Sequence, residues 1–179
     1  MGWLGQREGA WLHERARGID RAAVEPDREA KSISRDETFP QDLADDAALA
    51  ARLRALADRA AADLREVGLL ARTVTVKLRD ADFTTRQASR TLSDPVHSER
   101  VVYEVARDLL RKLRAARRMP ARLLGVAVSQ LVTPDATAQL SLLAAVRPLE
   151  TERDRTISRV IDEVREKFGS DALGRGQAR

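Results

Sequence analysis

The residues of this chain that could do chemistry are few and lie far apart. Its 179 residues include no cysteine and two histidines, His13 and His97, each of them isolated. The lack of cysteine excludes disulfides, zinc–thiolate clusters and thiol nucleophiles. Asp80 and Asp82 could bind a metal ion at a strand end, although acidic pairs in turns usually serve the turn itself. Because no glycine-rich phosphate loop or nucleophile elbow is present either, the sequence predicts no active site.

The stretch RTVTVKLRD points to a binding surface instead. Its apolar residues alternate with polar ones that face the other way, namely Thr73, Thr75, Lys77 and Arg79. Hydroxyl groups and strand amides can bond phosphate oxygens, while the two cations neutralise phosphate charge. A merely solvated sheet face is the alternative. Aromatic residues that could stack on unpaired bases are missing apart from Phe83, which favours contacts with a duplex backbone.

Composition agrees with an anionic partner. The net charge is +4, the isoelectric point is about 10.1, and arginine is abundant. A GC-rich genome would also enrich arginine, so the composition alone decides nothing. No apolar run approaches the roughly 18 residues that a membrane span needs. The N-terminus lacks the apolar stretch of a signal peptide, so we expect a cytoplasmic protein without a membrane partner.

Hydrophobic periodicity predicts six elements that would position the polar face, in the order strand, helix, strand, strand, helix, strand. The strands are expected over residues 31–39, 72–80, 83–92 and 122–132, with Pro40 and Asp94-Pro95 as breakers. The first helix starts near Asp45 and stops at Gly68; the second runs from a Ser98 cap to Pro120. This order predicts an α+β fold, a four-stranded antiparallel sheet with two helices on one face. The other face stays open.

Five stretches, in the family's order and spacing, resemble the Y-family translesion DNA polymerases of the DNA polymerase IV type. They are ARGIDRAAVEP, REAKSISRDETFPQDL, RTVTVKLRDADFTTRQASRTL, RLLGVAVSQLV and AQLSLL, and they lie between Ala16 and Leu143. The resemblance implies that residues 29–132 form the little finger, a domain that lies across the major groove and grips both DNA backbones. Residues 1–28 resemble the end of the thumb, with a helix near 10–17.

The resemblance also implies which side chains lie at primer–template duplex DNA. They are Lys31, Ser32, Ser34 and Arg35 on the first strand, Thr75, Lys77 and Arg79 on the second, and Arg86, Ser89, Arg90 and Thr91 on the third. Relatives often read TRSRTL on that third strand, where this chain has Gln87-Ala88. Arg86 is thereby displaced by two residues, which keeps it on the same face of the strand.

The family's palm and fingers have no counterpart in this sequence. Phosphoryl transfer by two metal ions needs the palm carboxylates, which bind Mg²⁺ in the complete polymerase. We therefore expect no cofactor in this chain and no DNA synthesis by it alone. The expected role is that of a monomer that grips DNA for translesion synthesis and repair. The alternative is a stand-alone, non-catalytic adaptor that binds DNA and the sliding clamp.

Residues 133–179 read as a tail that contains a short helix over 155–168. The stretch AQLSLL resembles the family's Gln-Leu-x-Leu-Phe peptide, which inserts into a pocket of the sliding clamp. The matching residues are Gln139, Leu140, Ser141, Leu142 and Leu143. Leucine replaces the terminal phenylalanine, so we expect clamp binding to be weaker by about 1 kcal/mol. Packing of these leucines in the core is the alternative.

Overall fold

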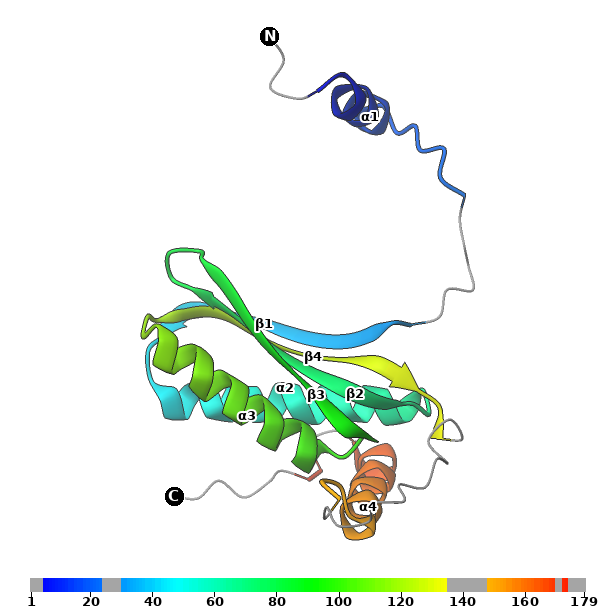
Figure 1. The fold of residues 1–179 in the computed structure, drawn as a ribbon. Coiled ribbons are helices and arrows are strands. Elements are labelled where there is room, and N and C mark those ends of the chain that lie inside the picture. The colour runs from blue at the N-terminus through cyan, green and yellow to red at the C-terminus, as the bar shows by residue number, and fades with distance from the viewer. Residues whose placement is uncertain (1–4, 24–29, 135–147, 170–171, 174–179) are drawn as a thin grey trace.

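A computed structural model describes residues 5–23, 30–134, 148–169 and 172–173 (Figure 1). Its elements, in chain order, are α1 (Gln6–Ala16), β1 (Ser32–Leu43), α2 (Asp46–Glu66), β2 (Leu70–Asp80), β3 (Thr85–Val96), α3 (Glu99–Ala116), β4 (Ala121–Val132) and α4 (Glu152–Phe168). All six elements predicted between residues 31 and 132 are therefore present, in the predicted order.

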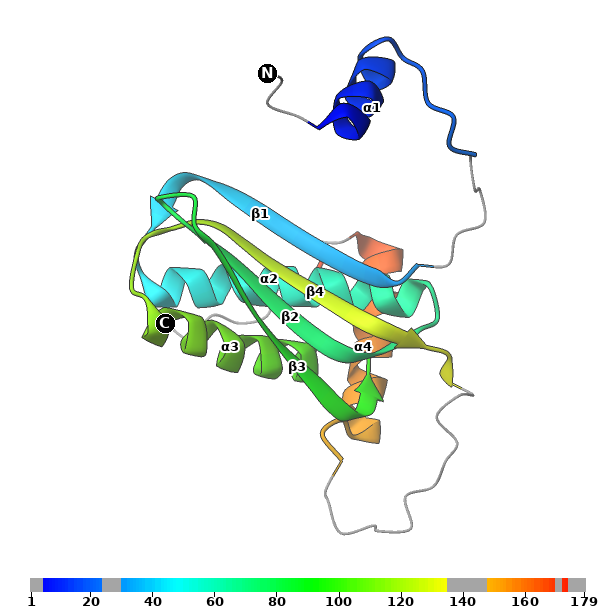
Figure 2. The ribbon, with the colours of Figure 1, turned by 45° about the horizontal axis from the view of Figure 1, so that its top comes forward.

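The four strands form one antiparallel sheet in the order β1-β4-β2-β3. The nearly continuous apolar strand β4 lies inside the sheet, and β1 and β3 form its edges. Helices α2 and α3 pack side by side on one face and leave the other uncovered (Figures 1 and 2). This confirms the predicted α+β fold.

The core lies between the sheet and the two helices. Leu49, Leu53 and Leu56 of α2 and the inward residues of β2 are almost completely removed from solvent. Val74, Val76 and Leu78 are fully buried, as the alternation along β2 predicts. At about 25 cal/mol per Å² of buried apolar surface, this layer is the main source of the domain's stability.

Two of the expected strand ends are wrong. β1 continues past Pro40 to Leu43, and β3 continues past Asp94 and Pro95 to Val96. Both are edge strands, where a missing backbone N–H need not break a ladder of hydrogen bonds. Each strand is irregular in its pairing near its proline. A proline therefore bends these edges without ending them.

The two core helices begin differently. The Asp45 carboxylate caps α2 by accepting from the backbone N–H groups of Ala47 (3.3 Å) and Ala48 (2.8 Å), as helix-start chemistry predicts. Ser98 stands at the N-cap of α3, but its hydroxyl makes no capping bond. Instead, the buried Glu150 carboxylate accepts from the backbone N–H of His97 (2.9 Å) and of Ser98 (2.6 Å). The cap of α3 thus comes from a residue just before α4.

Helix α4 lies at the end of the domain where α2 ends and α3 begins, and polar contacts hold it there (Figure 1). Arg65 of α2 forms a bidentate ion pair with Asp162, at 2.6 and 2.7 Å. The buried Ser158 hydroxyl donates to Glu99 of α3 at 2.6 Å. The residues predicted on one apolar side of this helix include Ile157, Val160 and Phe168, which are all exposed. Part of the apolar side of α4 therefore faces solvent.

Candidate nucleic-acid interface

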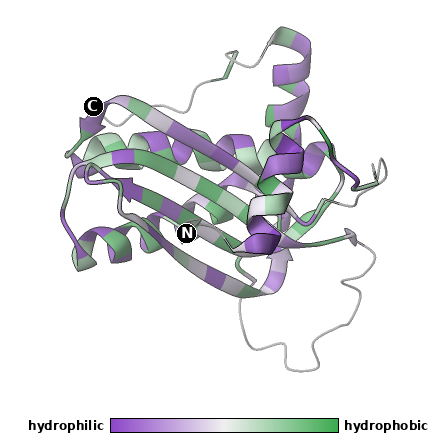
Figure 3. Cartoon of the chain, turned by 90° about the horizontal axis from the view of Figure 1, so that it is seen from above, coloured by the Kyte–Doolittle hydropathy of each residue, from purple (hydrophilic) through white to green (hydrophobic). Residues whose placement is uncertain are grey.

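The uncovered face of the sheet, called the open face below, is built from cross-strand rows. Residues paired across an antiparallel sheet point to the same side, so the register defines its members. They are Ser32, Ser34, Asp36 and Thr38 on β1, Leu123, Gly125, Ala127 and Ser129 on β4, Thr73, Thr75, Lys77 and Arg79 on β2, and Thr85, Gln87, Ser89 and Thr91 on β3. Hydroxyl groups dominate this surface. Figure 3 looks onto it and shows polar and apolar residues alternating along the strands.

Hydrogen bonds between neighbouring strands organise the polar side chains of the open face. The hydroxyls of Thr75 and Ser89 lie 2.8 Å apart, and Arg79 donates its Nε–H to the Thr85 hydroxyl at 2.9 Å. Such bonds fix side-chain directions before a ligand arrives, which lowers the entropy lost on binding.

Lys77 is paired within the open face. Its ammonium group donates to the Asp36 carboxylate, which reaches across from β1 on the far side of β4. Gly125 of β4 lies beneath this bridge, and a Cβ there would collide with the Asp36 carboxylate. The absence of a side chain at this glycine therefore lets β1 and β2 interact across β4.

The structure divides the predicted DNA-contacting residues between the two faces of the sheet. Those on the open face are Ser32, Ser34, Thr75, Lys77, Arg79, Ser89 and Thr91. Lys31 directly precedes β1 and is exposed. The other three point toward the helices: Arg35, Arg86 and Arg90. Arg86 and Arg90 thus lie on the same face of β3, as the two-residue displacement predicts. That face is turned toward the helices, whereas Lys77 lies on the open face.

Each of those three arginines has a carboxylate partner. Arg35 donates to Asp63 of α2 at 2.5 Å, and Arg90 lies 3.6 Å from Asp108 of α3. Arg86 forms a bidentate ion pair with the fully buried Asp80, at 2.8 and 3.0 Å. The Arg35 and Arg90 pairs connect strands to helices, and the Arg86 pair connects β3 to β2.

Asp80 and Asp82, the acidic pair considered for a metal ion, are both engaged by Arg117. The guanidinium lies 3.1 Å from Asp80 and 2.6 Å from Asp82. Its hydrogen bond to Asp82, with a further bond from the Thr84 backbone N–H, lowers the pKa of that carboxyl to about 2. Asp80 and Asp82 therefore serve as carboxylate partners of arginine side chains. Over the residues that the structure describes, no three His, Cys, Asp or Glu side chains gather in a way that could hold a metal ion.

Several members of the open face are not among the residues predicted from the sequence. Asp36, Thr38 and Gln87 alternate with residues that point to the helices, but β1 and β3 contain few apolar residues to mark the inward side. Only pairing with β2 and β4 identifies the faces of these strands.

The predicted clamp peptide, Gln139–Leu143, lies outside the described residues. No helix in the described segments is long and apolar enough to cross a membrane.

The family model for the impB/mucB/samB family C-terminal domain matches residues 30–142. A DNA polymerase IV of Dehalococcoides mccartyi strain CBDB1 is 35% identical over 178 residues, which cover 98% of this chain and 44% of the relative. The DNA polymerase IV of Alkalilimnicola ehrlichii is 45% identical over 135 residues, or 74% of this chain and 37% of the relative. The chain thus spans less than half the length of these relatives.

Solved structures agree on the fold. A Y-family DNA polymerase chimera, Dbh-Dpo4(243-245)-Dbh, superposes with a TM-score of 0.54 at 23% identity, over 72% of this chain and 36% of the chimera. An insertion ternary complex of Dbh DNA polymerase gives 0.52 at 22% identity, over 72% and 36%. The fold is therefore shared with these Y-family polymerases. The chain belongs to the impB/mucB/samB family, and its region from residue 30 is a DNA polymerase IV-like C-terminal domain.

Proposed function

We propose that this chain grips duplex DNA through the open face, as the little finger of a DNA polymerase IV-like enzyme in translesion synthesis and repair. The observation that carries the proposal is the composition of that face: hydroxyls on all four strands, with Lys77 and Arg79 among them. Gly125 and Ala127 on β4 are small, and the Lys77–Asp36 pair lies above Gly125, so a phosphate backbone that approaches the middle of the face would meet this pair.

The chemistry of the open face favours backbone contact over base reading. Hydroxyl groups can donate to phosphate oxygens, and Lys77 and Arg79 can neutralise two phosphates. Reading of base edges in the major groove would call for a protruding helix or ribbon, which a flat sheet of short side chains does not provide. Gripping would therefore depend little on DNA sequence.

Lys77 must exchange its partner when DNA binds. A phosphate that replaces Asp36 beside the ammonium group leaves that carboxylate close to the negative DNA backbone. Asp36 thus limits affinity, which suits a domain that must release one phosphate to reach the next. The relatives named DNA polymerase IV and the Dbh ternary complex support DNA as the ligand.

Titration of a labelled duplex with the purified chain at several salt concentrations tests this proposal. We expect affinity to fall linearly with salt on logarithmic axes, with a slope of about −0.9 for each neutralised phosphate. Duplexes of unrelated sequence should bind alike. Binding that does not change with salt would contradict the proposal.

Arg86 and Arg117 engage Asp80 and Asp82, so this acidic pair is not our candidate for the Mg²⁺ that nucleotide addition requires. The role that we propose for this chain is the positioning of DNA. A primer-extension assay with the chain alone should show no synthesis. The proposed setting is the cytoplasm, where the chain acts as a monomer.

We also propose that Gln139, Leu140, Ser141, Leu142 and Leu143 dock on the sliding clamp. The support is their match to the family's peptide and their place shortly after β4, which would tether the clamp to the DNA-binding domain. Binding two linked targets raises the effective concentration at each. Replacing Gln139 and Leu142 with alanine should abolish clamp pull-down, and Leu143→Phe should strengthen it. A loss of folding in the alanine variant would instead assign these leucines to the core.

A further inference from the structure

The turn between β2 and β3 holds an aromatic side chain in solvent. Phe83 lies in this turn and is 62% exposed, whereas Phe39 and Tyr103, the other aromatic residues between 30 and 134, are buried. The turn lies at the upper left of Figure 1, on the side of the sheet away from α2 and α3. An apolar ring thus stands at one end of the open face.

The backbone at Phe83 has a conformation that a bulky residue seldom takes. Its φ angle is 65°, in the left-handed region. Three backbone hydrogen bonds, each of 2.9 Å, hold the turn in this shape: the N–H groups of Phe83, Asp80 and Ala81 donate to the carbonyls of Asp80, Thr84 and Pro120, respectively. Strain of this kind persists only where surrounding contacts fix it, and such residues gather at ligand-binding and active sites.

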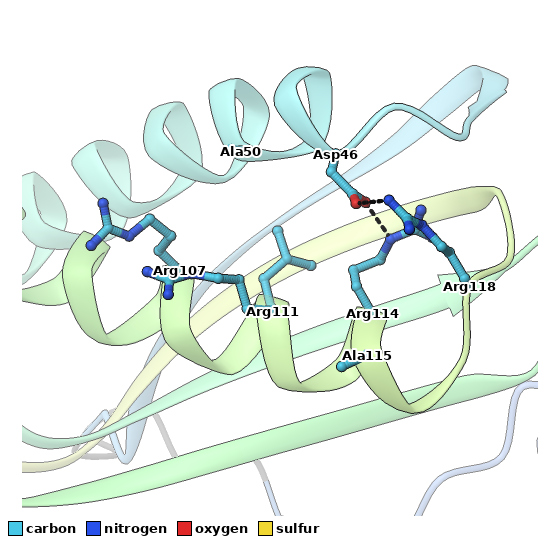
Figure 4. Close-up of a pocket in the computed structure, with 8 residues that line it drawn as sticks. Asp46, Ala50, Arg107, Arg111, Arg114, Ala115 and Arg118 are labelled. Carbon is cyan, nitrogen blue, oxygen red and sulfur yellow. Dashed lines mark hydrogen bonds and ion pairs between the residues drawn. The ribbon is translucent and has the colours of Figure 1, made fainter.

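Ion pairs fasten the turn to the ends of the two core helices. Arg117 pairs with Asp82 in the turn itself, at 2.6 Å, and neutralises that carboxylate next to the ring. Arg114 and Arg118, which lie close to it in the chain, pair with Asp46 at the start of α2, at 2.7 and 2.8 Å (Figure 4). The ring therefore projects from a rigid support, so little entropy is lost when it contacts a ligand.

Arg122 of β4 covers one face of the Phe83 ring. Its guanidinium carbon lies 4.8 Å from the ring centroid, a cation–π contact. Arg122 follows Ala121, which is fully buried and pairs with Asp80, so the Arg122 side chain points to the opposite side of the sheet, that of the open face. The Arg122 side chain is 41% exposed, with the Asp42 carboxylate 3.8 Å away. The guanidinium thus holds the ring and leaves its other face to solvent.

From this arrangement we propose that Phe83, with Arg122 behind it, stacks on an unpaired nucleobase of DNA. The proposal rests on duplex binding by the open face, which this site adjoins: Arg79, the last open-face residue of β2, pairs with Thr85 and Leu123 beside the turn. A strand that leaves the duplex at this end would pass Arg79 with a phosphate and lay an unpaired base on the ring. Because every base has a π-face, stacking there would depend little on sequence.

The size of the site favours a base over a protein partner. Stable protein interfaces bury about 800 Å² on each partner, whereas the apolar surface here is a single ring. A flat base matches one ring in area, and its phosphate matches the cations Arg79 and Arg122 beside it. Stacking and charge would therefore both contribute to binding, and each can be measured separately.

Duplexes with a short single-stranded overhang separate stacking from charge. One overhang consists of adenines, and its control carries abasic sugars at the same positions with every phosphate kept. In titrations with the full chain, followed by fluorescence anisotropy, we expect the adenine overhang to bind at least about fivefold more tightly. Equal affinities at both the 3′ and the 5′ end would overturn the proposal. Binding of a blunt duplex and its salt dependence report on the open face alone, so the two failures can be told apart.

Two exposed phenylalanines provide a matched pair of variants. Phe83→Ala should reduce the preference for adenine to less than about twofold and leave blunt-duplex affinity unchanged within about twofold. Phe168, at the end of α4, is 67% exposed and also has a cation near its ring, since Lys167 Nζ lies 5.4 Å from the centroid. Phe168→Ala should keep the full preference. Equal losses in the two variants would contradict a defined site at Phe83.

Two milder substitutions exclude an effect of the turn's shape. Phe83→Tyr keeps the aromatic ring and should keep the preference for adenine. Phe83→Leu keeps an apolar side chain without a flat π-face and should lose most of the preference. If leucine preserves it, the contact is merely apolar and the stacking proposal fails.

Discussion

The two sides of the sheet use their charged residues in opposite ways. On the open face, two cations lie among many hydroxyls, and Lys77 has a partner that a phosphate can replace. On the helix side, Arg65, Arg86 and Arg114 are largely buried, and their carboxylate partners come from other elements. Several arginines of this chain therefore fasten helices and strands to one another. The open face, which we propose as the DNA-binding surface, has only two cations in its strand rows, Lys77 and Arg79.

The largest effect should come from the helix side. Arg86→Ala would leave the fully buried Asp80 with only Arg117, and would remove a donor to the Leu113 carbonyl. We expect the free energy of unfolding in urea to fall by about 3 kcal/mol, because removing one partner of a buried pair is costly. Arg90→Ala is the control on the same strand and face; its exposed pair with Asp108 should contribute less than about 1 kcal/mol. Similar losses of unfolding free energy in both variants would contradict the proposed difference between buried and exposed arginine pairs.

The next effect should appear on the open face. Replacing Lys77 and Arg79 together with alanine should lower duplex affinity about tenfold at low salt and reduce the salt slope by about 2. Stability should change little, since both side chains lie on the surface of the sheet. Arg111→Ala, on the helix side, is the matched control for duplex binding. If it weakens DNA binding as much as the double variant does, the two sides do not differ in function.

A smaller change of opposite sign should follow from Asp36→Asn. The amide cannot repel phosphate, and Lys77 loses its competing carboxylate. We expect duplex affinity to rise about threefold at low salt, as estimated for one exposed charge pair, and the gain to shrink as salt is added. Fluorescence anisotropy at two salt concentrations would measure it. Glu104→Gln changes the same charge on the exposed side of α3 and should have no effect; an equal gain there would indicate a general charge effect.

The smallest effect concerns acid stability at the β2–β3 turn. Arg117 and the Thr84 backbone hold the pKa of Asp82 at about 2, below its ordinary value. A lowered carboxyl pKa stabilises the fold above the ordinary value near 3.9 and loses that contribution as pH falls through 2. Between pH 4 and pH 2, the free energy of unfolding measured in urea should therefore fall more for the wild type than for Asp82→Asn. Parallel pH profiles for the two proteins would contradict this assignment.

Sequence periodicity predicted the elements and the core because burial imposes a regular spacing on apolar residues. The alternation of Val74, Val76 and Leu78 identifies both faces of β2 without a structure. The stretch TRQASRT of β3 has no comparable apolar row, so the inward direction of Arg86 and Arg90 follows only from pairing with Leu78 and Val74.

Other features depended on contacts between segments far apart in the chain. The Lys77–Asp36 pair joins two strands on either side of β4, and no local pattern marks it. Pro40 and Pro95 are ordinary breakers in isolation, and only the edge location of β1 and β3 makes them acceptable. The cap that Glu150 supplies to α3 spans more than fifty residues of chain. Such pairings need the topology before they can be predicted.

Helix α4 has a thermodynamic consequence for the domain. Arg100 of α3 adds a bidentate pair with Asp154, at 2.6 and 2.8 Å, to the polar contacts that hold it. Because Ile157, Val160 and Phe168 are already in solvent, release of the helix would uncover apolar surface mainly at the half-buried Ile161 and Val164. The heat-capacity change and the urea dependence of that release would both be small, since each scales with newly exposed area. Local opening of α4 would thus be detected by hydrogen exchange at its amides, while calorimetry would record only the unfolding of the core.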